Sequence, residues 1–138
     1  MTTAPDAPEG PAALVQELGR RFRAGAIDDA RALYAPGICI EQPASLPHGG
    51  RNVGLGGIDA MSATFARHWD RVIDPSSRLI DAGDVAVMVT TQTWTAKDTG
   101  RSATTDVVEL FTAADGAITE IRVFPQDVHA LLATLDPQ

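Results

Sequence analysis

The chain has 138 residues, which is enough for one hydrophobic core and too few for two. Its composition, 44% hydrophobic and 21% charged, is that of an ordinary folded protein. A net charge of −7 disfavours nucleic-acid binding, which needs a basic face, and adsorption to anionic membranes. The longest apolar runs are strand-sized and far shorter than a membrane span. We therefore expect neither nucleic acid nor a membrane as a partner.

Residues 1–10 are rich in Pro, Ala, Thr and acidic residues, and they predict a flexible tail. This segment has neither the basic start nor the apolar stretch of a signal peptide. Residues 11–138 are then expected to form a single domain. The single cysteine, Cys39, has no partner for an internal disulfide, which fits a cytoplasmic protein.

The first half of the chain predicts three helices and one short strand. An amphipathic helix follows the tail, and a shorter helix capped by Asp28 precedes a strand over residues 38–42. The Gly- and Pro-rich residues 44–57 predict a loop. A third helix is expected from Ile58 to the Asp74-Pro75 stop, with four apolar residues on one face: Met61, Phe65, Trp69 and Val72.

The second half predicts an antiparallel sheet. β-branched residues and apolar alternation mark strands over residues 78–82, 85–96, 103–112 and 117–124. Asp115-Gly116 is a hairpin signal, and Asp127 can cap a last helix. Helices followed by a run of antiparallel strands predict an α+β fold.

Five sequence stretches carry a family resemblance: RAGAIDDARALY (23–34), EQPASLPHGG (41–50), GIDAM (57–61), ELFTAADGAI (109–118) and RVFPQD (122–127). With this order of elements, the chain resembles the nuclear transport factor 2-like superfamily, which includes ketosteroid isomerases, limonene epoxide hydrolases and SnoaL-like polyketide cyclases. The LPHGG stretch is most similar to the SnoaL-like branch. The resemblance implies helices packed on a strongly curved, mainly antiparallel sheet that forms a cone with an apolar pocket.

The resemblance does not supply a known set of catalytic residues. Where ketosteroid isomerases have a tyrosine, a carboxylate base and an acid donor, this sequence has Leu18, Gln42 and Val108. Arg101 and Asp106 lie five residues apart and on opposite faces of a strand, so they do not form the triad of limonene epoxide hydrolases. The late acidic position of the SnoaL-like cyclases falls among residues 121–124, none of which is acidic.

The superfamily pattern puts Val108 and Leu110 on the pocket face, and alternation brings Asp106 to the same face. Asp106 is then the leading candidate for acid/base chemistry, because an isolated carboxylate on an apolar wall has a raised pKa. The alternative is a carboxylate at the rim, either exposed to water or paired with Arg101 or Arg122. We expect the pocket wall to contain Ile40, Phe65, Trp69, Val108, Leu110, Ile121 and Val123.

Gln42 and His48 complete the candidate catalytic set as hydrogen-bonding anchors for a substrate. Gln42 can equally satisfy a loop backbone, and His48 can be an ordinary loop histidine. Trp94 can line the pocket or anchor a dimer interface, and the interface is favoured. The three histidines are too scattered for a metal site, so neither a metal nor a cofactor is expected.

Two main functions remain open from the sequence, beside a weaker third in which side chains fill the pocket and the protein is a scaffold. The first is a cofactor-independent cyclase, isomerase or hydrolase that acts on a small hydrophobic, oxygenated molecule of the polyketide or terpenoid kind. The second is a non-catalytic module for ligand binding or dimerisation with the same fold. In either case we expect a homodimer, because the outer face of a long, Thr-rich sheet needs cover.

Overall fold

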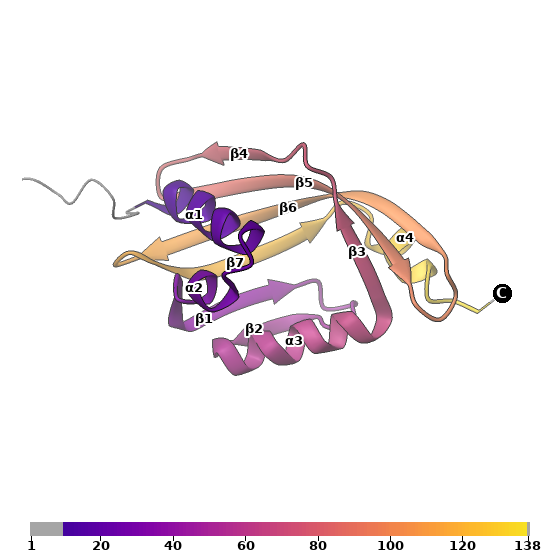
Figure 1. Cartoon of the computed structure of the whole chain (residues 1–138). Helices are drawn as coiled ribbons and strands as arrows, with labels where there is room; N and C mark the ends of the chain where they lie inside the picture. Colours follow the sequence, from indigo (N-terminus) through magenta and orange to yellow (C-terminus); the bar gives the residue numbers. More distant parts are fainter. Residues whose placement is uncertain (1–9, 138) are drawn as a thin grey trace, which may run out of the picture.

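The computed structural model describes residues 10–137, so residues 1–9 of the predicted tail lie outside the described part. Within it the chain forms four helices and seven strands (Figure 1). The helices are α1 (Pro11–Arg23), α2 (Ile27–Arg31), α3 (Gly54–His68) and α4 (Val128–Ala133). The strands are β1 (Tyr34–Gln42), β2 (Gly50–Val53), β3 (Trp69–Ile73), β4 (Arg78–Asp81), β5 (Val85–Ala96), β6 (Ser102–Ala114) and β7 (Ala117–Pro125).

All seven strands belong to one sheet in the order β2-β1-β7-β6-β5-β3, with β4 also paired to β5. Every pairing is antiparallel except that of β1 with β7. The sheet curls strongly, with α1 and α2 over one face and α3 beside β1 and β2 (Figure 1). The predicted α+β fold, with helices packed on a curved and mainly antiparallel sheet, is confirmed.

Local sequence signals explain several of the element boundaries. Pro11 occupies the first turn of α1, where its missing N–H costs no hydrogen bond. The Asp127 side chain accepts a hydrogen bond of 2.9 Å from the Ala130 N–H and caps α4, as predicted. Asp115 and Gly116 have φ angles of 54° and 75°, so they form the predicted hairpin between β6 and β7.

Several boundaries in the first half differ from the prediction, among them the start of β1, which lies at Tyr34 instead of residue 38. α3 starts at Gly54 and ends at His68, and residues 69–73 form the strand β3 instead of continuing the helix. The spacing of Trp69 and Val72 fits a helix, but Trp69 is 1% exposed and Val72 is 69% exposed. Residues 69–73 pair with β5 from Trp69–Ala96 to Ile73–Gln92, so the tertiary pairing overrides the local pattern. The predicted loop over residues 44–57 also contains β2.

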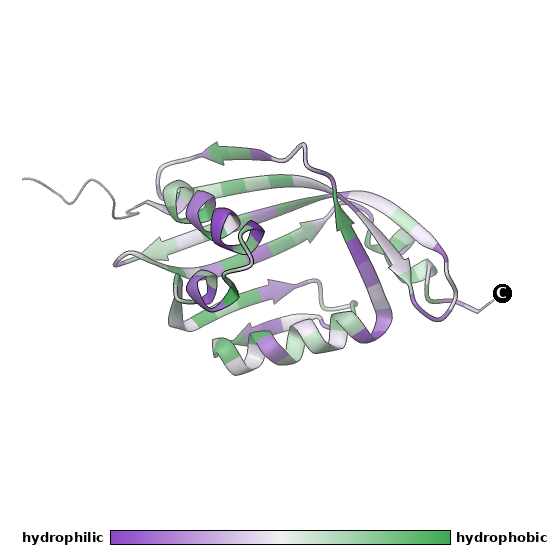
Figure 2. Cartoon of the chain, in the orientation of Figure 1, coloured by the Kyte–Doolittle hydropathy of each residue, from purple (hydrophilic) through white to green (hydrophobic). Residues whose placement is uncertain are grey.

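The apolar interior consists of two clusters. The larger cluster joins α1 and α3 to the inner face of the sheet, and includes Leu14, Ile38 and Ile118, which have no exposed surface. The smaller cluster packs α4 against Trp69 and Trp94, and the Trp69 indole N–H donates a 2.8 Å hydrogen bond to Thr134 Oγ1. Figure 2 shows that β5 is hydrophobic in its first part and more polar beyond it.

None of the helices in the described residues is long and apolar enough to cross a membrane.

Candidate functional site

The orientation of β6 decides which side chains enter the concave side of the sheet. Val107 and Phe111 are 1% and 4% exposed and pack inward, and alternation places Glu109 between them on the same face. Asp106 is exposed on the opposite face, where it accepts a 2.7 Å hydrogen bond from Thr91 Oγ1. The carboxylate on the inner face is therefore Glu109.

This result corrects the predicted facing of β6. Asp106, Val108 and Leu110 were expected to line the pocket, but all three belong to the outer face. The physical reason is the period of a strand: a shift of one residue exchanges every side chain between the two faces. Residues 106–111 (DVVELF) carry apolar residues in both phases, so alternation alone does not choose between them.

A cavity with two chambers lies on the inner face. The narrow chamber has a volume of about 260 Å³ and the wide chamber about 520 Å³. Pockets of roughly 300–1,000 Å³ are usual for small molecules, so the cavity is of suitable size. The chambers share seven lining residues, Gln42, Met61, Ser62, Arg71, Gln92, Glu109 and Val123, and we describe them as one site.

The rest of the lining divides into a closed end and a mouth. The narrow chamber continues to His48, Phe65, Trp94 and Val107. The wide chamber runs under α1 and α2, and Phe22, Ile27 and Ile73, each at least 40% exposed, mark its opening to solvent. The cavity wall is thus more polar than expected, because Arg71, Gln92 and Glu109 stand among the apolar side chains.

Glu109 is the only carboxylic acid among the described residues that line the two chambers. Its strand neighbours are apolar: Met88 on β5 and Val123 on β7. Burial among these side chains raises the pKa of the Glu109 carboxyl above its usual range, and the charge of Arg71 opposes part of this rise. No hydrogen bond from residues 10–137 holds this carboxyl, so a bound molecule can reach it.

Arg71 reaches both chambers from β3. Strand alternation puts it on the same face as Trp69 and Ile73, and its guanidinium carbon lies 5.0 Å from the centre of the Phe65 ring. This distance is typical of a cation–π contact. Sequence analysis missed Arg71 because it assigned residues 69–73 to a helix.

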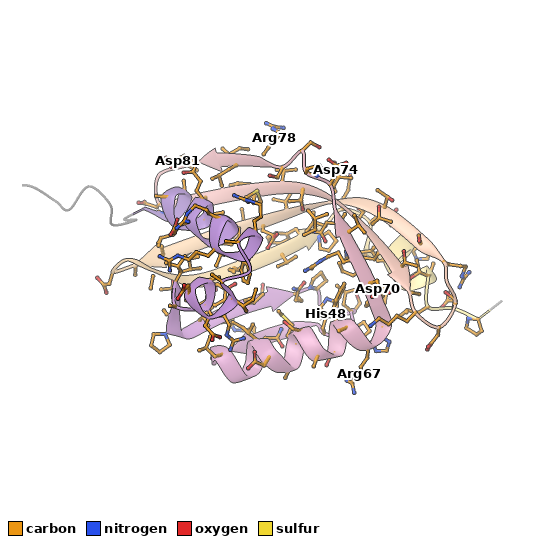
Figure 3. The ribbon with its side chains drawn as sticks, viewed as in Figure 1. His48, Arg67, Asp70, Asp74, Arg78 and Asp81 are labelled. Carbon is orange, nitrogen blue, oxygen red and sulfur yellow. The ribbon has the colours of Figure 1, made fainter. Side chains whose placement is uncertain are left out.

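His48 is enclosed by aromatic rings at the closed end of the narrow chamber. Its ring centroid lies 5.2 Å from that of Phe65 and 5.9 Å from those of Trp69 and Trp94. Burial, together with the positive charge of Arg71, lowers the pKa of His48 to about 4, so the imidazole is neutral near pH 7. His48 is 5% exposed and its Nδ1 has no hydrogen-bond partner in the described residues (Figure 3).

Two glutamines supply amide groups to the cavity. Gln92 is fixed, because its oxygen accepts from the Trp94 indole N–H and its nitrogen donates to Thr90 Oγ1, both at 2.9 Å. Gln42 is held loosely, with a 3.7 Å contact from its Nε2 to the sulfur of Met61. Gln42 therefore offers a polar group that is free to turn toward a ligand.

The other predicted lining residues are placed as follows. Of the predicted wall, Ile40, Phe65, Ile121 and Val123 line the cavity, and Gln42 and His48, predicted as hydrogen-bonding anchors, line it too. Trp69 is buried behind the narrow chamber and does not line it. Trp94 is 3% exposed and lines the narrow chamber, so the favoured assignment to a dimer interface is wrong. Among residues 10–137 no group of three or more His, Cys, Asp or Glu side chains is arranged to hold a metal ion.

One signal in the sequence could have revealed Glu109. At the start of β6, Ser102, Thr104 and Asp106 form one phase, and all three are polar. When one face of a sheet covers a core, the polar residues of an alternating strand point to the opposite, outer face. If residues 102, 104 and 106 point outward, alternation along the strand places residue 108 on the outer face and Glu109 on the inner face.

The sequence model of the SnoaL-like domain family matches residues 15–121 of this chain. The protein belongs to the SnoaL-like domain family. The match includes every residue that lines the cavity except Val123, so almost the whole cavity lies within the family domain. None of the curated proteins matches this chain in sequence.

Solved structures share the fold at low sequence identity. An NTF2-like protein from Burkholderia thailandensis E264 is 22% identical over 94% of this chain and 99% of its own, with a TM-score of 0.81. A candidate SnoaL-like polyketide cyclase from Jannaschia sp. CCS1 is 19% identical over 100% and 99%, with a TM-score of 0.71. TerC, co-crystallised with polyporic acid, is 23% identical over 91% and 98%, with a TM-score of 0.75.

Proposed function

We propose that this SnoaL-like protein binds a small, mostly apolar, oxygenated molecule in the two-chamber cavity and acts on it by acid/base chemistry through Glu109. The observation that carries the proposal is the place of the Glu109 carboxyl, which both chambers share and no described residue binds. The TerC structure supports the ligand class, since that protein of the same fold was crystallised with polyporic acid.

The chemistry follows from the environment of Glu109. Burial raises the pKa of the Glu109 carboxyl above its usual range, and a carboxyl with a raised pKa is better suited to general acid/base chemistry than an ordinary surface carboxylate. The protonated form would donate to a carbonyl or hydroxyl oxygen of the substrate, and the ionised form would accept a proton from a carbon beside that group. Both steps fit a cofactor-independent isomerisation, cyclisation or hydrolysis, and two of the similar structures are described as candidate polyketide cyclases.

Three neutral groups would orient the substrate. His48 presents an imidazole that stays neutral near pH 7, and Gln92 presents an amide fixed by Trp94 and Thr90. Gln42 lies on the opposite wall, on β1, and is free to turn. Because neutral hydrogen-bonding groups hold a substrate without competing for its proton, we assign them to binding and Glu109 to proton transfer.

The test is conversion of small oxygenated ring compounds, followed by mass spectrometry and chiral chromatography. The wild-type protein and Asp106→Asn should convert a compound that Glu109→Gln binds and leaves unchanged. Equal conversion by Glu109→Gln would refute the role of Glu109. Asp106→Asn is the matched control, because it removes a carboxylate three residues away on the opposite face.

One observation favours binding without catalysis as the second candidate. No hydrogen bond among residues 10–137 orients the Glu109 carboxyl, whereas a committed acid or base is often held by a partner. Recovery of a bound compound unchanged from the wild-type protein, after long incubation at several pH values, would support this candidate.

We also propose a cytoplasmic homodimer that pairs through the outer face of the sheet. The cross-strand pairs Val87–Leu110 and Val89–Val108 lie on that face, beside Phe124, which is 42% exposed. An apolar group of this kind, open on one side of a sheet, is typical of a subunit interface. The cytoplasmic location is supported by Cys39, a buried free thiol.

A further inference from the structure

Arg71 is a charged donor without a protein partner at the junction of the two chambers. No hydrogen bond or ion pair within residues 10–137 involves its side chain, although a guanidinium has five N–H donors. Arg31, Arg51 and Arg122, by contrast, each lie within ion-pair distance of a carboxylate. Arg71 is instead held over the face of the Phe65 ring.

The position of Arg71 distinguishes it from an ordinary surface arginine. Its head lines both chambers, whereas Arg78 on β4 projects away from the sheet into solvent (Figure 3). Arg71 keeps exposed surface, so a molecule in the cavity can reach its charge, while burial of the guanidinium lowers its pKa. An apolar cavity with an accessible guanidinium at the junction of its two chambers fits a ligand that has both an apolar body and an anionic group.

Glu109, the one acid that the described residues contribute to the cavity, competes weakly for Arg71. Glu109 forms no ion pair with Arg71 in the described residues, and its apolar neighbours favour the neutral carboxyl. A ligand carboxylate, by contrast, can take two parallel N–H bonds from the guanidinium. The free donors of Arg71 are thus open to an oxygen anion that enters from solvent.

We infer that the ligand is a small organic acid, whose ionised carboxylate binds Arg71 at the junction of the two chambers while its apolar ring occupies the narrow chamber beside Phe65 and Trp94. The inference rests on the proposed function, because it names the ligand class of the same cavity. A neutral ligand would leave the guanidinium without a partner, and a cationic ligand would be repelled by it.

The ligand charge also acts on Glu109. An anion bound to Arg71 cancels the positive charge that partly favours the ionised form of Glu109. The other groups that face this region are His48, which is neutral near pH 7, and Tyr34 and Arg31 at the far wall of the wide chamber. Binding of the anion should therefore be accompanied by proton uptake at Glu109.

The experiment compares 2-naphthoate with 2-naphthamide, which have the same shape and differ in charge, by isothermal titration calorimetry at pH 7. We expect the wild-type protein to bind the carboxylate at least tenfold more tightly than the amide, as one charge-assisted bidentate contact provides. Arg71→Gln should reduce this preference to twofold or less while it retains amide binding. Arg78→Gln, which removes the same charge from the surface, should retain the full preference.

The outcomes separate the two proposals. Equal affinity of the wild-type protein for both probes, or a preserved preference in Arg71→Gln, would overturn the assignment of an acid ligand and leave the cavity proposal intact. Binding of neither probe would overturn both. If Arg71→Gln does not fold, as judged by circular dichroism, Arg71→Lys takes its place: it keeps the charge but loses the bidentate geometry, and its preference should fall at least threefold.

Discussion

Asp106 and Glu109 lie three residues apart on β6 and occupy opposite faces of the sheet. Asp106 bonds to Thr91 on the outer face, and Glu109 enters a cavity walled by apolar side chains. Two carboxylates of the same strand thus have different environments and different chemistry. Asp106→Asn is therefore a matched control for Glu109→Gln.

The first prediction concerns the pH dependence of stability at Glu109. Its folded-state pKa is raised above the ordinary value of 4.5, so the folded protein holds this proton more tightly than the unfolded chain. The stability is then greatest at low pH and falls as pH rises through the folded pKa. Glu109→Gln should therefore raise the free energy of unfolding at pH 8 by roughly 1–2 kcal/mol, with a smaller gain at pH 5.

The measurement is urea unfolding of the wild-type protein, Glu109→Gln and Asp106→Asn at the two pH values. Asp106→Asn should show no such gain. A Glu109→Gln protein that is less stable than the wild type at pH 8 would mean that the carboxylate is stabilised in the fold.

The second prediction concerns His48, whose effect on stability has the opposite pH dependence to that of Glu109. Its folded pKa of about 4 lies below the ordinary 6.5, so between these values the unfolded chain binds the proton and the folded protein does not. Stability should fall by about 3 kcal/mol as pH decreases from 6.5 to 4, since one pKa unit corresponds to about 1.4 kcal/mol. His48→Gln should remove this dependence, whereas His129→Gln, on the exposed side of α4, should keep it.

Thermal denaturation across that pH range measures the difference in slope. The slope is compared instead of the absolute stability, because a buried glutamine in place of His48 has its own cost. An unchanged slope in His48→Gln would show that His48 titrates near its ordinary pKa.

The fold was more predictable from sequence than the site. Turn and cap residues such as Asp115-Gly116 and Asp127 act locally, and their positions in the structure agree with the sequence pattern. The identity of the inner-face residues depends on strand phase, and in DVVELF both phases are apolar. Within this stretch the sequence does not separate Glu109 from Asp106; the pairing with β5 and β7 does, and the polar phase at the start of β6 agrees with it.

Arg71 shows a second limit of sequence reasoning. Trp69 and Val72 continue the helical spacing of Met61 and Phe65, so the pattern favoured a longer helix. Residues 69–73 nevertheless form β3, because they complete the edge of the sheet beside β5. That change in secondary structure is what brings Arg71 to the cavity, and no local signal indicates it.

The third prediction uses the two tryptophans as reporters. Trp94 lines the narrow chamber, while Trp69 lies behind it with its indole N–H bonded to Thr134. A ring compound in the narrow chamber should change the fluorescence of the wild-type protein and of Trp69→Phe. Trp94→Phe should lose most of the change. A response that instead disappears in Trp69→Phe would place the ligand elsewhere.

The fourth prediction concerns the attachment of α4. Thr134→Val removes the acceptor of the buried Trp69 N–H and should lower the free energy of unfolding by about 1–3 kcal/mol, the usual cost of an unsatisfied buried donor. Thr104→Val is the control, since its hydroxyl bonds to Thr93 on the exposed face. Equal stability of the two variants in urea unfolding would show that the Trp69–Thr134 bond contributes little.

The fifth prediction tests the dimer. The wild-type protein should show a dimer mass in light scattering at micromolar concentration, and Val108→Lys should show a monomer mass, because it places a charge in the centre of the outer apolar group. A wild-type monomer would refute the homodimer.

The most direct test of the account is the titration of the Glu109 carboxyl carbon by NMR, assigned by comparison with Glu109→Gln. We predict a pKa above 4.5 in the free protein and a further rise when 2-naphthoate binds, with neither value altered in Asp106→Asn. A Glu109 pKa at or below 4.5 that does not respond to the ligand would contradict the claim that this carboxyl is the acid/base group of the cavity.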